Sequence, residues 1–436
     1  MEKPTINVVV IGQADAGKST TAGHLIYNCR GVDEQTINKL ENEAKETGSQ
    51  SSKYAWIFDK LKTERETGRT TDTTLQTFEN HRYKFNIIDA PGCPTVIENT
   101  ITGTSQADVA LLVIDASEGC HEAGMDENGQ TREHALLAYA LGVKQMIVAV
   151  NKMDDATVDF SEDRWKMIRS QVATYLKGIG YHPMKIPFIP VSSWLGDNLT
   201  SKSIHMPWYD GPSILEALEN VTTPRRPKDK PLRVPIQDVR DTEGIGTVLV
   251  GRVETGVLKP GTNVQIAPSV NCGVIRSLQI DFEEVAQAIP GDVVSINIDH
   301  KWDAVSNFGR GHVLSNSEDR PAQEVSSFDA QIIIMNHSEE IFEGKTLVVD
   351  CHTSHTPCTV DAIQQKMDRR TGKVVENNPK SVKTGDACIV RLKPSRPLCV
   401  EQFKDFPSLG RFSVRDSGQT VGFGVVKKAY YGRVEE

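Results

Sequence analysis

The chain has 436 residues, of which 38% are apolar and 25% charged, and its formal net charge is −9. This length predicts about three domains, and no apolar run approaches the roughly 18 residues that span a bilayer. The acidic balance does not favour nucleic-acid binding, which would have to depend on local basic patches. Eight scattered cysteines and the absence of a signal pattern at the N-terminus predict reduced thiols and a cytoplasmic location, with no membrane partner.

The first 222 residues alternate short apolar runs with helical patterns, which indicates a mostly parallel sheet covered on both faces. The expected strands are 6–12, 82–89, 108–115, 144–151 and 187–193. A polar stretch at about residues 30–72 is expected to contain helices inserted into a long loop. Long polar loops beside a phosphate site are often switches.

A glycine-rich loop follows the first expected strand. Gly12 to Ser19 matches the pattern G-x-x-x-x-G-K-[ST] and leads into a predicted helix. Glycines let the backbone amides turn inward, and the helix N-terminus adds positive charge where a polyphosphate would lie. Lys18 supplies a point charge, and the Ser19 hydroxyl is suited to a magnesium ion that bridges the outer phosphates. The pattern therefore predicts a phosphate site; the alternative is a glycine-rich turn that binds nothing.

Three further motifs end later strands, where the ligands of doubly wound sheets collect. Asp89 can hold magnesium through a water, and the Gly92 amide can bond a terminal phosphate. Asn151-Lys152-Met153-Asp154 ends in a carboxylate that can accept two hydrogen bonds from guanine, one of them from an amine that adenine lacks. Ser192-Ser193-Trp194 offers a backbone amide to the guanine oxygen. Each motif alone is commoner as turn chemistry, but in this order they predict a guanine-nucleotide domain.

A proline-rich charged segment at residues 224–231 marks a change of composition and is expected to link domains. After it, short apolar runs between Gly and Pro turns predict a small β-barrel and then a second β-rich unit. The predicted fold is an α/β P-loop GTPase domain at 1–222 followed by two β-barrel domains at 230–316 and 321–432. Nucleotide chemistry is expected in the first domain alone.

Further segments carry a resemblance along almost the whole chain. They are Lys53–Trp56, Asp59–Lys62, Thr102–Asp108, Asn128–Ala135, Gly251–Gly261, Leu409–Phe412 and Val414–Asp416. They resemble the elongation factor 1-alpha family of translational GTPases. The resemblance implies that the GTP form carries aminoacyl-tRNA to the ribosomal A site, hydrolyses GTP on decoding and is recycled by a guanine-nucleotide exchange factor. It also implies that the first barrel binds the aminoacyl end and the second barrel tRNA or a protein.

The resemblance assigns ligand contacts residue by residue. GTP or GDP would be held by Gly12, Asp15, Ala16, Gly17, Lys18, Ser19, Thr20, Asp89, Gly92, Asn151, Lys152, Asp154, Ser192, Ser193 and Trp194. The implied ligands of Mg²⁺ are Ser19 and Thr70.

The chain departs from the family at the candidate catalytic residues, Cys93 and Arg69. Cys93 stands where the family has a histidine that positions the attacking water, and a thiol is a poor substitute. Two apolar residues that gate this histidine are replaced by Ala14 and Arg69. Loss of a positioned catalytic group costs about 10²- to 10⁴-fold, so these changes predict slow GTP hydrolysis. Alternatively, Arg69 acts as an internal arginine finger.

The cargo-binding region also departs from the family. Residues 277–280 read Ser-Leu-Gln-Ile where the family lines its aminoacyl pocket, and Phe282 is placed to stack on a base or to pack at the barrel rim. Ala16, the segment 403–406 and the acidic balance favour an alternative function, a GTP-regulated carrier of a release or ribosome-rescue factor with weak or lost hydrolysis. Residues 351–358 have zinc-ligand types, but strand alternation would point them to opposite faces, so no zinc is expected.

Overall fold

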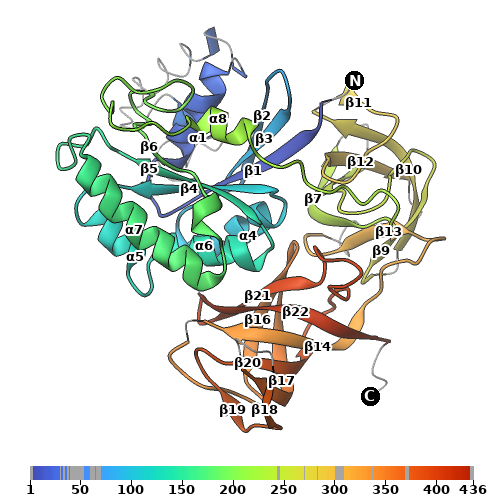
Figure 1. The fold of residues 1–436 in the computed structure, drawn as a ribbon. Helices are drawn as coiled ribbons and strands as arrows, with labels where there is room; N and C mark the ends of the chain where they lie inside the picture. The colour runs from blue at the N-terminus through green and yellow to red at the C-terminus, as the bar shows by residue number, and fades with distance from the viewer. Residues whose placement is uncertain are drawn as a thin grey trace. The chain divides into compact units, whose positions relative to one another are not determined.

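The computed structural model describes residues 3–29, 31–32, 35–36, 39, 54–58, 64, 70–242, 246–269, 271–281, 283–299, 309–335, 337–368 and 373–432. They form two compact units (Figure 1), the first containing residues 1–139 and 143–224 and the second 140–142 and 225–436. Arg69 and Phe282 lie outside the described residues.

The first unit is built on a six-stranded sheet with the order β2-β3-β1-β4-β5-β6. Its strands are β1 (Thr5–Ile11), β2 (Thr74–Glu79), β3 (Lys84–Asp89), β4 (Val109–Asp115), β5 (Gln145–Asn151) and β6 (Phe188–Pro190). The pairings from β3 through β6 are parallel, and β2 runs antiparallel to β3. The Val- and Ile-rich runs of β1 and β4 are buried almost throughout because helices cover both faces.

Six helices and three 3-10 turns belong to this unit in the described part of the chain. They are α1 (Lys18–Asn28), α4 (Ile97–Ser105), α5 (Cys120–Met125), α6 (Gln130–Ala140), α7 (Glu162–Ile179), α8 (Ile214–Glu219), η1 (Ala55–Ile57), η2 (Pro94–Val96) and η3 (Pro183–Lys185). Figure 1 shows α1 and α8 on one face of the sheet and α4 to α7 on the other.

Local sequence explains where the last two of these helices begin. Ser161 caps α7 by accepting a hydrogen bond from the Arg164 amide, and Ser213 caps α8 by accepting one from Glu216. The Glu216 side chain bonds back to the Ser213 amide, so α8 begins with a complete capping box. At its other end, α7 stops at Gly180, whose φ of 123° disfavours other residues.

The expected parallel strands are confirmed, with two differences. The last expected strand, 187–193, ends at Pro190, because Ser193 instead donates its amide to the Asn151 side chain. The strand β2 was missed because it lies just beyond the polar stretch and is mostly half-buried, so its sequence lacks a clear apolar alternation. Most of that polar stretch lies outside the described residues.

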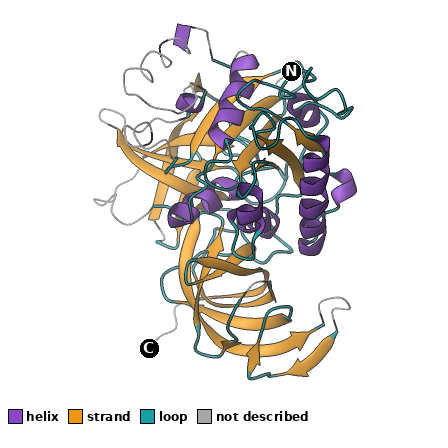
Figure 2. Cartoon of the chain, turned by 90° about the vertical axis from the view of Figure 1, so that its left-hand side faces the viewer, coloured by secondary structure: helices purple, strands orange, loops and turns teal. Residues whose placement is uncertain are grey.

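The second unit contains two closed β-barrels, as predicted; Figure 2 shows this region to be almost entirely strand. The ring β10-β12-β8-β7-β13-β9 closes through pairing of β9 with β10, and β11 extends it. Its strands are β7 (Val234–Thr242), β8 (Gly246–Arg252), β9 (Asn263–Ala267), β10 (Asn271–Ile280), β11 (Glu283–Glu284), β12 (Val293–Asp299) and β13 (Val313–Asn316).

The second ring, β16-β21-β22-β14-β20-β17, closes through β16 and β17, and β18 extends it. Its strands, with the small β15–β19 sheet, are β14 (Val325–Ile334), β15 (Ile341–Phe342), β16 (Thr346–Cys351), β17 (Ser354–Met367), β18 (Val374–Asn377), β19 (Ser381–Val382), β20 (Ala387–Pro394), β21 (Arg411–Asp416) and β22 (Gln419–Tyr431). Alternate residues of β14 are buried, as expected for a strand with one face on a barrel core.

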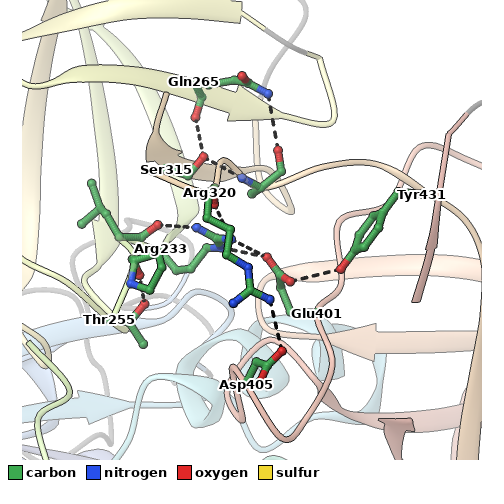
Figure 3. Close-up of polar contacts among 11 residues, drawn as sticks. Arg233, Thr255, Gln265, Ser315, Arg320, Glu401, Asp405 and Tyr431 are labelled. Carbon is green, nitrogen blue, oxygen red and sulfur yellow. Dashed lines mark hydrogen bonds and ion pairs between the residues drawn. The ribbon is translucent and has the colours of Figure 1, made fainter. Parts of the chain in front are cut away.

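A buried ion pair joins the two barrels (Figure 3). Arg233, just before β7, donates from Nε and Nη2 to Glu401 Oε1 at 2.9 and 2.7 Å. The remaining guanidinium donors reach the carbonyls of Leu232 and Arg320, and Tyr431 donates to Glu401 Oε2. Because the charges are paired and further hydrogen-bonded, their burial is tolerated.

Phe406 is buried at the same junction. The Arg233 guanidinium carbon lies 4.4 Å from the centre of the Phe406 ring, a cation–π distance. Arg320 contacts the same ring and pairs with Asp405 at 3.2 Å. In the segment 403–406, which favoured the protein-carrier alternative in the sequence, Phe406 therefore contacts the chain's own first barrel and Asp405 the connection between the barrels.

Candidate nucleotide site

The loop between β1 and α1 is shaped by two glycines. Gly12 has a φ of 142° and Gly17 a φ of 89°, values that side chains disfavour. A Cβ atom on Gly12 would lie 2.2 Å from the carbonyl oxygen of Val113, and one on Gly17 would lie 2.3 Å from Asn151 Nδ2. Close approach and backbone conformation therefore both require glycine at these positions.

The Lys18 side chain folds back onto the phosphate loop, residues 12–19. Its ammonium group donates to the Gln13 carbonyl at 2.8 Å. Burial lowers the pKa of Lys18 to about 8, against the opposing effect of the negative charges of Asp89 and Asp15. A Cβ atom on Gly92 would lie 2.2 Å from Lys18 Nζ. Asp89 and Gly92, which were predicted to meet the magnesium ion and the terminal phosphate, therefore both lie near the buried Lys18 ammonium group.

Three oxygen donors meet beside this lysine. Ser19 Oγ donates to Asp89 Oδ2 at 2.5 Å and lies 3.1 Å from Thr70 Oγ1. Asp89 is fully buried, burial raises its pKa to about 6, and its Oδ1 has no hydrogen-bond partner among the described residues. Two hydroxyls and a carboxylate with an unsatisfied oxygen form a donor set that Mg²⁺ prefers. These residues fit a magnesium ion.

Asn151, at the end of β5, connects the phosphate loop to the third motif. Its Nδ2 donates to the Ala16 carbonyl at 2.8 Å, and its Oδ1 accepts from the Ser193 amide at 2.9 Å. The Ser193 hydroxyl lies 2.6 Å from Thr21 Oγ1 in α1. Motifs that are more than 100 residues apart in the sequence therefore share one hydrogen-bond network. Thr20 is half-buried in the first turn of α1.

The groups predicted to hold guanine differ in what they already contact. Lys152 has a φ of 61° and pairs with the buried Asp115 at 2.6 Å. Ser192 Oγ accepts the Leu195 amide. The Asp154 carboxylate is half-buried and makes no hydrogen bond or ion pair with the described residues, and Trp194 is 62% exposed. An acceptor and an aromatic surface are thus available to a base.

Two side chains that sequence reasoning did not assign support the loop from α6. Gln130 Oε1 accepts the Ala14 amide at 3.1 Å, and His134 Nδ1 accepts the Gly12 amide at 2.9 Å. The two residues are four apart and therefore share one face of the helix. The segment 128–135 was part of the family resemblance, and this spacing of polar residues was the available signal.

His134 makes the stability of the first unit sensitive to acid. Burial and the Lys18 charge lower the pKa of His134 from 6.5 to about 3, so below pH 6.5 the unfolded chain binds a proton that the folded chain does not. The free energy of unfolding should therefore fall with decreasing pH, by at most about 1.4 kcal/mol per pH unit. We expect His134→Gln to flatten this dependence between pH 7 and 5, measured by urea denaturation. His81→Gln, at an exposed position, serves as the control, and equal pH dependence in His134→Gln and the unsubstituted chain would contradict the prediction.

The candidate catalytic thiol is turned toward its own loop. Cys93 is half-buried, and its Sγ lies 3.0 Å from Thr95 Oγ1. It directly follows Gly92, where an added Cβ atom would lie 2.7 Å from the Ala14 amide nitrogen. Residue 93 is therefore next to the phosphate loop.

In the first barrel, residues 277–280 of β10 were predicted to meet aminoacyl cargo, but their side chains do not all reach the surface. Leu278 is fully buried in the core, whereas Gln279 is exposed. Strand alternation explains the difference.

The segment 351–358 forms the hairpin between β16 and β17. Cys351 Sγ contacts the carbonyls of Leu409 and Arg411, His352 Nε2 lies 2.9 Å from the Cys399 carbonyl, and His355 pairs with Asp350. Within the described ranges, no group of three or more His, Cys, Asp or Glu side chains could hold a metal ion. The same part of the chain contains no helix long and apolar enough to span a membrane.

Comparison with known families covers both units. The model "Elongation factor Tu GTP binding domain" matches residues 3–224, "Elongation factor Tu domain 2" matches 246–301, and "GTP-eEF1A C-terminal domain-like" matches 327–427. The chain is 53% identical to elongation factor 1-alpha of Tetrahymena pyriformis over 427 residues, which cover 98% of each protein. It is 54% identical to that of Euglena gracilis over 98% of this chain and 95% of the relative.

The fold is similar to that of a solved structure of lower identity. The Ski7 GTPase-like domain of S. cerevisiae, bound to GDP and inorganic phosphate, matches with a TM-score of 0.83 and 20% identity over 97% of each chain.

Proposed function

The chain belongs to the elongation factor 1-alpha family of translation elongation GTPases, and from this premise we propose that its GTP form delivers aminoacyl-tRNA to the ribosomal A site. The observation that carries the proposal is the match through all three parts of the chain, at 53% identity over 98% of its length. A match confined to the GTP-binding domain would support a nucleotide switch alone. The barrels at 230–316 and 321–432 are proposed to contact the aminoacyl end and the tRNA body.

The proposed nucleotide contacts are those that converge around the β1–α1 loop. Lys18 and the loop amides bind the phosphates, and Asp154 accepts hydrogen bonds from guanine. Ser19, Thr70 and Asp89 are the residues that would hold Mg²⁺, directly or through water, and the bound ion would offset the negative charge of the outer phosphates. The unsatisfied Asp89 Oδ1 supports this assignment.

We further propose that hydrolysis is slow. Cys93 stands at the position of the family histidine, and its Sγ already contacts Thr95. A thiol is only a weak donor and a weak acceptor, so it holds a water less firmly than an imidazole does. The nucleotide-binding groups are retained, so slow turnover would prolong the GTP-bound state without weakening binding. We also propose that the protein is located in the cytoplasm and that a guanine-nucleotide exchange factor recycles it.

Protection of the aminoacyl ester tests the proposed cargo directly. The full chain is loaded with a non-hydrolysable GTP analogue or with GDP, mixed with aminoacyl-tRNA, and the rate of spontaneous deacylation is measured. At a free protein concentration 100 times the dissociation constant, bound tRNA should exceed free tRNA by about 100-fold, so deacylation should slow strongly in the analogue form and little in the GDP form.

The same experiment decides against the proposal if nucleotide binds and no protection appears. That outcome would favour the protein-carrier alternative, in which a release or rescue factor occupies the barrels. Deacylation of tRNA without protein and with the nucleotide alone provides the baseline.

A further inference from the structure

The backbone after Thr70 is held by a buried carboxylate. Glu64 is fully buried, and its Oε1 accepts hydrogen bonds from the Thr71 amide at 2.8 Å, the Thr71 hydroxyl at 3.1 Å and the Asp72 amide at 3.1 Å. One carboxylate oxygen thus binds both residues that follow the proposed magnesium ligand.

The opposite side of the same segment is held by α4. Asn99 Nδ2 donates to the Thr71 carbonyl at 2.8 Å, and Thr73 Oγ1 donates to the Asn99 carbonyl at 3.0 Å. One turn further along the helix, a Cβ atom on Gly103 would lie 3.1 Å from Thr73 Cγ2. Residues 71–73 therefore rest closely on one face of α4.

Thr100, the residue of α4 next to Asn99, holds the turn that follows Asp89. Thr100 Oγ1 donates to the Pro91 carbonyl at 2.7 Å, in the turn between Asp89 and Gly92. Adjacent side chains of one helix thus bond the backbone that follows Thr70 and the backbone that follows Asp89. In both hydrogen bonds the acceptor is a backbone carbonyl oxygen. Together they fix the path of the backbone after Thr70 relative to that of the backbone after Asp89.

We propose that Glu64 and Asn99 are positioning residues that clasp residues 71–73, hold the Thr70 hydroxyl beside Ser19 and thereby set the affinity of the GTP form for Mg²⁺. Thr70 Oγ1 lies 3.1 Å from Ser19 Oγ, and fixing a loop residue in one conformation costs backbone entropy. The clasp supplies part of that order before the ion arrives. This inference rests on the proposed magnesium site and does not depend on which cargo the barrels bind.

The test measures how much Mg²⁺ the full chain needs to retain a fluorescent non-hydrolysable GTP analogue. Glu64→Leu removes the acceptor at similar volume, and Asn99→Ala removes the donor. Loss of groups that orient metal ligands typically costs about 10- to 100-fold in metal affinity, so the Mg²⁺ concentration for half-retention should rise by that factor in both variants. Glu64→Gln keeps an acceptor oxygen and should restore most of the affinity.

The control for Asn99→Ala is Asn220→Ala at the end of α8, where the lost Nδ2 bond also goes to a backbone carbonyl. It should leave the Mg²⁺ midpoint unchanged. An unchanged midpoint in Asn99→Ala, or an equal shift in Asn220→Ala, would overturn the clasp. If Glu64→Leu does not fold, Asn99→Ala still decides. Missing ester protection with a shifted midpoint would refute the cargo proposal alone.

Discussion

Replacing Cys93 with histidine should accelerate GTP hydrolysis on programmed ribosomes by about 10²-fold, the lower end of what a positioned general base or water-orienting group contributes. The position is suitable, because Cys93 follows Gly92, and an added Cβ atom on Gly92 would lie 2.2 Å from Lys18 Nζ. We expect less than the full effect, because the resemblance implies that Ala14 and Arg69 stand where the family has the residues that gate the histidine. Single-turnover hydrolysis with limiting factor and excess ribosomes measures the chemical step.

The matched control is Cys272→His, which makes the same substitution at an exposed cysteine of the first barrel. Its hydrolysis rate should equal that of the unsubstituted chain. GTP affinity should not change in Cys93→His, because the phosphate loop and Asp154 are untouched. Equal rates in all three proteins would show that Cys93 does not limit hydrolysis. That result would favour the alternative in which Arg69 acts as an arginine finger.

The nucleotide site could be anticipated because its parts are local patterns placed at strand ends. Parallel strands bring their carboxyl ends to one edge, so Asp89 and Asn151 had to lie near Lys18 once the strand order was right. The support from α6 could not be derived in this way. Ala14 and Gln130 are 116 positions apart, and no local pattern indicates which polar residues of a helix face a loop.

The second unit also has a fold that the sequence predicts and a contact that it does not. Strand alternation and turn residues predicted two barrels, because each strand buries every second side chain. The contact between them depends on Arg233 and Glu401, which are 168 positions apart, and each residue read alone would be placed at the surface. The segment 403–406, together with Ala16 and the acidic balance, was interpreted as favouring a protein carrier; the structure shows Phe406 buried against Arg233.

Asp154→Asn should change the base preference from guanine to xanthine. The side-chain amide donates where the carboxylate accepts, so it faces the guanine N–H groups with a donor, whereas xanthine has a carbonyl in place of the exocyclic amine. Loss of two hydrogen bonds to a charged group, at about 1.5–3 kcal/mol each, lowers GTP affinity by about 10²- to 10⁴-fold. Direct titration of each protein with a fluorescent analogue of GTP and with one of XTP measures both affinities.

The neighbouring carboxylate separates a specific effect from a general loss of charge. Asp155 Oδ1 accepts the Thr157 amide at 2.8 Å and the Thr157 hydroxyl at 2.6 Å, whereas Asp154 has no such partner among the described residues. Asp155→Asn should therefore keep the preference for GTP over XTP, even if it loosens its own turn. An Asp154→Asn protein that still prefers GTP would mean that guanine is recognised elsewhere, with Ser192–Trp194 the next segment to test. Because the Asn151 bonds to Ala16 and Ser193 remain in both variants, a gain in XTP binding by Asp154→Asn would also show that the loop itself is intact.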